Sequence, residues 1–184
     1  WWASTSANGA GPSDRACWFD DVYNFDSDGA FINDMGAETW VEAWQGGADA
    51  CATPVSPHDG TAVSAFDYNE DAGTLTIHGR GAHLGLAKAV NGAELAASGD
   101  APETVTYQVA TLDGDNMTVT LETAAGVWWT FRLQRVSNSP FAGNWKLAGD
   151  GAASVGPVAD SAEWWASTAA NGAGPDERGC WFDD

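Results

Sequence analysis

Two tryptophans and two glutamates alternate between residues 38 and 44, which makes them candidates for contact with a sugar. If residues 39–45 form a strand, Trp40 and Trp44 share one face about 13 Å apart, because a strand rises about 3.3 Å per residue. Glu38 and Glu42 fall on the same face. The indoles could then stack on separate sugar units while the carboxylates accept hydrogen bonds from hydroxyl groups. The alternative is that both indoles are buried under a loop or at a contact between repeats.

The two glutamates do not have the spacing of a glycosidase pair. Retaining glycosidases hold their carboxyl groups about 5 Å apart and inverting ones about 6.5 to 9.5 Å apart, whereas Glu38 and Glu42 begin about 13 Å apart on a strand. The sequence has no Gly-x-Ser-x-Gly, P-loop or dinucleotide-binding motif, and no histidine adjoins a cysteine. We therefore expect a protein that is not an enzyme and that has no organic cofactor.

Four aspartates near the N-terminus are candidate ligands for calcium, which takes about six to eight oxygen atoms. They are Asp20, Asp21, Asp26 and Asp28. The stretch 26–29 is shorter than an EF-hand loop and is also typical of a hairpin turn. None of the three histidines has the spacing of a zinc site. Calcium is thus the one metal that the sequence suggests.

The chain contains a long internal repeat, since residues 1–21 return as residues 164–184. The two copies differ at only four positions, Ser6/Ala169, Ser13/Asp176, Asp14/Glu177 and Ala16/Gly179. The offset of 163 residues is the size of a domain. We interpret the chain as slightly more than one period of a tandem array. Residues 1–139 are then most of one repeat, without its own first strand, and residues 140–184 begin the next repeat.

Charge and cysteine content favour an extracellular protein. The net charge is −19, with only seven lysines and arginines, so we expect no binding to nucleic acid. No apolar run of 18 residues occurs, so we expect no membrane insertion. Cys17 and Cys51 lack zinc-site spacing and predict a disulfide, with two free buried thiols as the alternative. An acidic, lysine-poor domain also fits salt water, where screening reduces self-repulsion.

Hydrophobic alternation with a period of two predicts an all-β fold with antiparallel strands. Expected strands cover residues 17–25, 30–33, 39–45, 62–69, 74–78, 104–110, 116–122 and 127–136, with a further strand at 144–148. Short turns rich in Gly, Asp and Asn separate them. Residues 79–102 break the alternation, so an irregular excursion is expected there.

The residues Gly143-Asn-Trp145-Lys-Leu147 resemble the Gly-x-Trp first strand of lipocalin-like barrels, and the hairpin at 25–31 is similar to an early hairpin of that family. The resemblance implies an up-and-down barrel of about eight to ten strands with little helix. It also implies that Arg132 or Arg135 packs over Trp145. The tryptophan-rich motifs further resemble domains that recur in large secreted proteins of marine bacteria, some attached to glycoside hydrolases.

In a closed up-and-down barrel the first and last strands are neighbours. Residues 144–148 either belong with the repeat that follows or pair with 127–136 across the short linker 137–143. In the second case the barrel is permuted or strand-exchanged along a fibre, and Cys180 rather than Cys17 faces Cys51.

We therefore expect a structural and adhesive repeat of an extracellular or cell-surface protein, whose partners are neighbouring copies. In the pairs Trp1–Trp2 and Trp128–Trp129, one indole of each must face outward on a strand. Contacts between repeats are predicted at Trp1, Trp2, Trp128, Trp145, Trp164 and Trp165. One alternative is a carbohydrate-binding module of a secreted polysaccharide-degrading protein, which uses Trp40 and Trp44. Another is a barrel whose interior binds a small apolar ligand.

Overall fold

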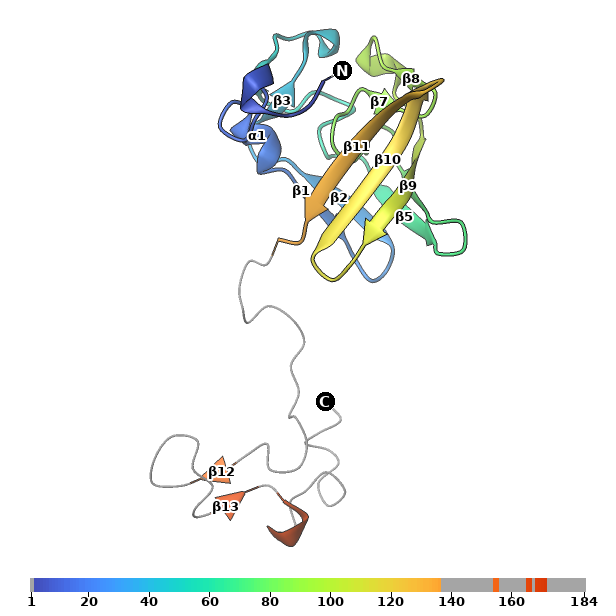
Figure 1. Ribbon diagram of the computed structural model, residues 1–184. Coiled ribbons are helices and arrows are strands. Elements are labelled where there is room, and N and C mark those ends of the chain that lie inside the picture. The colour runs from blue at the N-terminus through green and yellow to red at the C-terminus, as the bar shows by residue number, and fades with distance from the viewer. Residues whose placement is uncertain (1, 137–153, 156–164, 167, 172–184) are drawn as a thin grey trace. The chain divides into compact units, whose positions relative to one another are not determined.

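The computed structural model describes residues 2–136, 154–155, 165–166 and 168–171 (Figure 1). The chain divides into two units, Trp1–Val136 and Ser137–Asp184. Within the second unit, β12 (Ser154–Val155) pairs antiparallel with β13 (Trp165–Ala166), and the 3-10 helix η4 covers Ala169–Asn171. The expected strand at 144–148 lies outside the described residues. The predicted pairing of that strand therefore stays a prediction.

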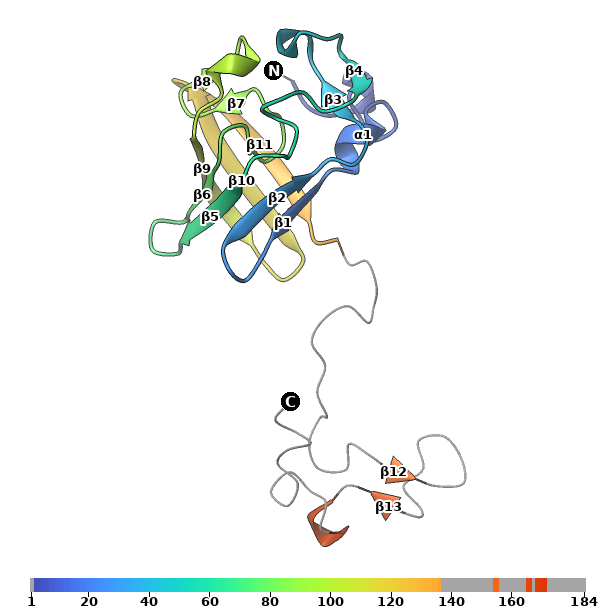
Figure 2. The ribbon, with the colours of Figure 1, turned by 180° about the vertical axis from the view of Figure 1, so that it is seen from behind.

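The first unit is built on a seven-stranded antiparallel sheet with the order β1-β2-β5-β6-β9-β10-β11. The strands are β1 (Val22–Phe25), β2 (Ala30–Asp34), β5 (Ser64–Asn69), β6 (Thr74–His78), β9 (Thr104–Leu112), β10 (Asn116–Ala124) and β11 (Val127–Gln134). The sheet curls into a half-barrel (Figures 1 and 2). The predicted antiparallel β fold is thus confirmed. Within the described residues β1 and β11 end the sheet without a further strand.

Short elements lie beside the sheet. Two are hairpins, β3 (Thr39–Val41) with β4 (Ala50–Ala52) and β7 (Ala89–Val90) with β8 (Ala93–Glu94). The helices are α1 (Ala16–Phe19) and the 3-10 helices η1 (Ser6–Asn8), η2 (Ala43–Gln45) and η3 (Ser98–Asp100). The little helix that was expected is therefore confined to single turns.

Two predicted strands, those at 17–25 and 39–45, are shorter than expected by four residues or more. The first begins at Val22, because Cys17 and its neighbours form α1. The strand expected at 39–45 ends at Val41, where a capping box between Glu42 and Gln45 begins η2. The Glu42 N–H donates to Gln45 Oε1 at 3.0 Å. The side chains of Glu42 and Gln45 thus form hydrogen bonds with backbone groups that a neighbouring strand would otherwise satisfy.

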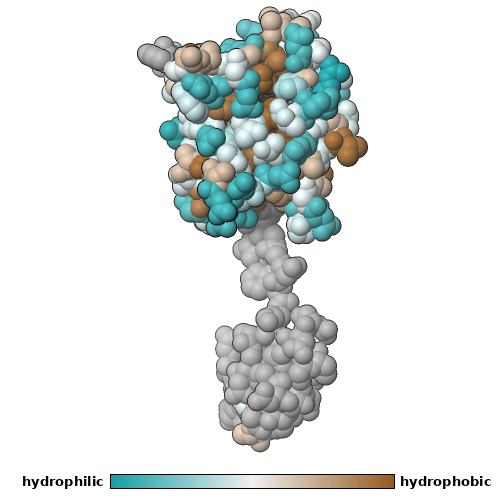
Figure 3. All heavy atoms as spheres, turned by 90° about the vertical axis from the view of Figure 1, so that its right-hand side faces the viewer, coloured by the Kyte–Doolittle hydropathy of each residue, from teal (hydrophilic) through white to brown (hydrophobic). Residues whose placement is uncertain are grey.

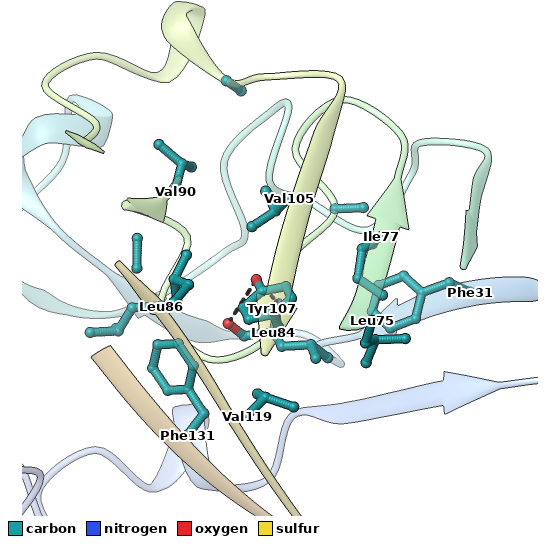
Figure 4. Packing of buried hydrophobic residues seen from close by; sticks show 14 of the residues in the cluster. Phe31, Leu75, Ile77, Leu84, Leu86, Val90, Val105, Tyr107, Val119 and Phe131 are labelled. Atoms are coloured by element: carbon teal, nitrogen blue, oxygen red, sulfur yellow. Dashed lines mark hydrogen bonds between the residues drawn. The ribbon is translucent and has the colours of Figure 1, made fainter. Parts of the chain in front are cut away.

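The concave face of the sheet carries the hydrophobic core, since alternate residues of each strand point inward. The largest fully buried side chains are Tyr107, Phe31, Ile77, Leu84, Leu121, Val41 and Val119. Figure 4 shows several of them gathered between β6, β9, β10 and the segment that carries Leu84 and Leu86. The core thus includes residues from outside the sheet.

That segment, residues 81–90, is called the inner segment here, and it belongs to the irregular stretch predicted at 79–102. It contributes Leu84, Leu86, Ala89 and Val90 to the core. The side-chain amide of Asn33 donates to the His83 carbonyl at 2.8 Å and its oxygen accepts from the His83 N–H at 3.2 Å. The chain thereby fills the concave face with its own residues. Because these residues fill the interior, the fold does not support the alternative in which the interior of the barrel binds a small apolar ligand.

Candidate functional site

A disulfide fixes the N-terminal segment to the half-barrel. Cys17 in α1 bonds to Cys51 in β4, with 5.9 Å between their Cα atoms and a sequence separation of 34. The predicted pairing of Cys17 with Cys51 is confirmed, and the permuted pairing of Cys51 with Cys180 is not what the structure has. The next residue, Trp18, donates from Nε1 to the Gly85 carbonyl of the inner segment at 3.3 Å. Residues 2–21 are therefore an integral cap on the first unit.

Aromatic rings and a cation form a stack where this cap meets the half-barrel. The Arg15 guanidinium carbon lies 3.9 Å from the centre of the Trp40 ring and 5.5 Å from that of Trp2. The Trp2 ring in turn lies 5.5 Å from that of Trp129. A cation over an indole face is attracted by the negative potential of the ring. We call Trp2, Arg15, Trp40, Lys88 and Trp129 the cap cluster.

Lys88 links the cap cluster to two carboxylates. Its Nζ lies 5.5 Å from the Trp129 ring centre, 3.3 Å from Glu42 Oε1 and 3.8 Å from Glu94 Oε2. Trp129 Nε1 donates to Glu94 Oε1 at 2.7 Å. The side chains of Lys88 and Glu42 are only 22% and 16% exposed, so solvent screens this pair less than a surface pair. Lys88 is thus paired with two carboxylates beside Trp129, the indole against which Trp2 of the cap packs.

The structure does not present Trp40 and Trp44 as one exposed platform. Trp40 is half-buried in β3, and Arg15 covers one face of its ring. Trp44 lies in η2, where Nε1 donates to Glu42 Oε2 at 3.0 Å and its ring meets His58 edge-on at 5.4 Å. Both indoles pack against the core. Glu38 is exposed.

Two histidines without the spacing of a zinc site, His58 and His83, are buried near Trp44. The rings of His58 and His83 lie 5.9 Å apart. Burial, together with nearby His83, lowers the pKa of His58 to about 4, and burial lowers the pKa of His83. Both imidazoles are thus neutral near pH 7. The adjoining cavity of about 10 Å³ is close to the volume that one water molecule needs. This pair is therefore too enclosed to bind a substrate.

The four candidate calcium ligands divide into two pairs. Asp20 and Asp21 precede β1, and Asp26 and Asp28 follow it, so Asp21 and Asp26 begin about 16 Å apart. Burial raises the pKa of Asp21 to about 7, although a hydrogen bond of 2.7 Å from Thr39 Oγ1 opposes the shift. Asp26 Oδ1 accepts from the Asp28 N–H at 2.6 Å and shapes the turn. The described part of the chain holds no group of three residues able to bind a metal ion.

Comparison of the chain with protein-family models, curated proteins and solved structures finds no match. No helix in the described residues is long and apolar enough to cross a membrane.

The predicted interface tryptophans fall in different surroundings. Trp2 belongs to the cap cluster and is 43% exposed. Trp128 is 52% exposed, whereas its neighbour Trp129 is half-buried and stacks on Phe131. One indole of this pair thus faces outward, as expected. Trp165 lies in β13. Trp1, Trp145 and Trp164 lie outside the described residues.

The contact of Arg132 or Arg135 with Trp145, which the lipocalin resemblance implies, stays a prediction, because Trp145 lies outside the described residues. Arg135 Nε donates to the Gly114 carbonyl at 2.6 Å, in the turn between β9 and β10. Arg132 is exposed on β11.

Sequence reasoning missed Arg15, Lys88 and Glu94. The scarcity of cations in this chain could have pointed to Arg15 and Lys88. The chain has only seven lysines and arginines, and these two lie over indole faces. Glu94 carries no such signal, since it is one of 26 acidic residues. Figure 3 shows one side of the unit, where hydrophilic residues cover most of the surface and hydrophobic ones show between them.

Proposed function

We propose that the chain is a non-enzymatic, structural and adhesive repeat of an extracellular or cell-surface protein, whose partners are neighbouring copies. The proposal rests on one observation: the residues through which the cap packs are identical in its second copy. The cap packs through Trp2, Arg15, Cys17, Trp18 and Asp21. Their counterparts in residues 164–184 are identical, namely Trp165, Arg178, Cys180, Trp181 and Asp184.

The positions at which the two copies differ also support the proposal. Positions 6, 13, 14 and 16 are the four that differ, and all four are exposed in the first copy. Substitutions at exposed positions change the free energy of folding little, whereas those in packed contacts change it strongly. This pattern supports a second copy that caps a second half-barrel of the same kind. An array of such units is the arrangement that the repeat favours.

The open sheet supports a specific form of linkage. Among the described residues β1 and β11 are the edge strands of the sheet, and an unpaired edge is a template for pairing with another segment. One added strand would close the half-barrel into an eight-stranded, lipocalin-like barrel. We propose that residues 144–148, or their counterparts in a neighbouring repeat, supply it. Repeats would then be joined by strands as well as by the linker.

The disulfide supports the proposed location. Disulfides persist in oxidising surroundings outside the cell and are rare in the cytosol. Cys17 and Cys51 bring two short elements together, and the cap has few other covalent or sheet constraints. Their bond fits a repeat exposed at a cell surface.

Hydrogen exchange across β11 tests the linkage. In the full chain we compare the wild type with Trp145→Pro, which removes a backbone N–H and breaks a strand, and with Gly149→Pro as a control outside the expected strand. Trp145→Pro should speed amide exchange in 127–134, while the control should not. Light scattering then gives the molar mass and distinguishes two sources of the strand. A strand from the same chain leaves a monomer, whereas a strand from a neighbouring chain gives a dimer. Equal exchange in all three proteins would contradict the proposed linkage.

A further inference from the structure

A surface groove opens where β9 and β10 separate. Their ladder ends at the pair Thr120 and Gln108. Beyond it the tip of the β7–β8 hairpin bridges the two strands, because the Gly92 N–H donates to the Glu122 carbonyl at 2.8 Å. On the other side, Asn91 exchanges two hydrogen bonds of 2.7 and 2.8 Å with the Thr106 backbone. The tip thus holds the strands apart, beside the upper ends of β10 and β11 (Figure 1).

The groove has a volume of about 510 Å³, within the range of roughly 300 to 1,000 Å³ that is usual for ligand sites. Thr106 and Gln108 line one side, and Glu122 and Trp128 line the other. Leu121 also borders the groove, although its side chain is buried in the core. The groove lies apart from the cap cluster, whose residues do not line it.

Trp128 lines this groove from β11. It pairs with Glu122 across the β10–β11 ladder, next to a register shift in the ladder. Such irregularities re-aim side chains. The indole is 52% exposed, and no ring or cation stacks on it in the described residues, unlike Trp2, Trp40 and Trp129. Trp128 therefore offers an uncovered flat apolar surface.

Planar polar groups accompany the indole. Glu122 Oε1 accepts from the Gly126 N–H at 2.8 Å, which fixes the carboxylate. Its other oxygen and the amide of Gln108 have no partner within the part of the chain that the structure describes. A flat apolar wall beside free donors and acceptors matches a ligand with C–H faces and hydroxyl edges, which is the chemistry of a sugar.

Charge narrows the ligand class. Among the described residues a carboxylate lines the groove and neither lysine nor arginine does, so phosphorylated, sulfated or uronic ligands would be repelled. A quaternary ammonium ligand is best held by a cage of several aromatic rings, and this groove has one. We propose that the groove binds a neutral glycan, with Trp128 as the stacking residue and Gln108 and Glu122 as hydrogen-bonding residues. This site does not depend on the proposed strand linkage.

Affinity gel electrophoresis of the full chain tests this site. Native gels contain laminarin, hydroxyethyl cellulose, xylan, galactomannan or soluble starch as neutral probes, with alginate as the anionic probe. We expect at least one neutral polysaccharide, and not alginate, to retard the protein. Trp128→Ala and Gln108→Ala should each weaken that retardation about tenfold or more, the effect of losing about 1.4 kcal/mol. Trp128→Phe should retain part of it, because the smaller ring still stacks.

Leu112→Ala is the matched control, since it removes an exposed apolar side chain from β9 outside the groove. It should bind like the wild type, and urea unfolding should show that all variants are folded. Three results would each overturn the proposal: no retardation by any neutral probe, retardation that survives Trp128→Ala, or equal retardation by alginate. A change of mass in Trp128→Ala without any change in retardation would instead assign this tryptophan to a contact between copies. The linkage is tested with Trp145→Pro and Gly149→Pro by hydrogen exchange, and the groove is tested with Trp128→Ala and Gln108→Ala by gel retardation, so the two proposals fail separately.

Discussion

The hydroxyl group of Tyr107 accepts a hydrogen bond from the backbone N–H of Leu84 at 2.9 Å and donates one to the Leu84 carbonyl at 3.4 Å. Tyr107 is fully buried in β9, and Leu84 lies on the inner segment, which has no strand partner at this point. The Tyr107 side chain thus forms the hydrogen bonds that a neighbouring strand would otherwise form with this segment, which crosses the core (Figure 4). Tyr23 does the same for Gly85, whose N–H it accepts at 3.1 Å.

Tyr107→Phe should destabilise the protein by about 1 to 3 kcal/mol, because it leaves the buried Leu84 N–H without an acceptor while it keeps the ring. Urea unfolding followed by tryptophan fluorescence measures the change. Tyr68→Phe is the control, since Tyr68 is 43% exposed and should lose little. Equal losses in the two variants would show that the Leu84 hydrogen bond contributes nothing of its own.

Gly85→Ala should destabilise the protein more than Gly92→Ala. Both glycines have a positive φ, 73° and 78°, so each alanine suffers about 1 to 2 kcal/mol of left-handed backbone strain. A Cβ at Gly85 would also lie 2.3 Å from Phe131 Cδ1, whereas a Cβ at Gly92 meets open space. Overpacking should add about 1 to 3 kcal/mol at Gly85 alone. Thermal unfolding of both variants gives the difference, and a smaller loss at Gly85 would refute the close packing against Phe131.

Asp21→Asn should make the protein more stable above pH 7 and should flatten its pH dependence. Burial raises the pKa of Asp21 from 3.8 to about 7 in the folded state. A raised pKa means that the folded state binds a proton more tightly than the unfolded state, so the stability from this group is complete below pH 4 and is lost as the pH rises to 7. Asparagine removes that loss.

The measurement for Asp21 is the unfolding free energy in urea between pH 4 and pH 8. Asp71→Asn, at an exposed turn position, makes the same change of charge and should keep the slope of the wild type. The interpretation fails if Asp21→Asn and the wild type lose stability in parallel across this range.

Local patterns in the sequence were enough to predict the β class, most strand positions and the Cys17–Cys51 pair. Strands with a period of two, such as β9, β10 and β11, carry their own signal, because alternate residues are buried or half-buried along much of each strand. The shorter β1 and β3 were overextended. There α1 and the capping box at Glu42 replaced strand hydrogen bonds with local ones, and hydrophobic alternation does not report such bonds.

The sequence alone determined that the chain repeats, that it is strongly acidic and that it forms antiparallel strands, since each of these follows from residues near one another or from direct comparison of two stretches. Only the tertiary structure decided which tryptophans are covered. Arg15 lies on Trp40 across 25 positions of chain, and Trp128 is left uncovered where the hairpin tip at Asn91 holds two strands apart. Spacing along a strand gives the face on which a side chain lies, but what covers that face comes from segments distant in the sequence, and that is decided when the core packs.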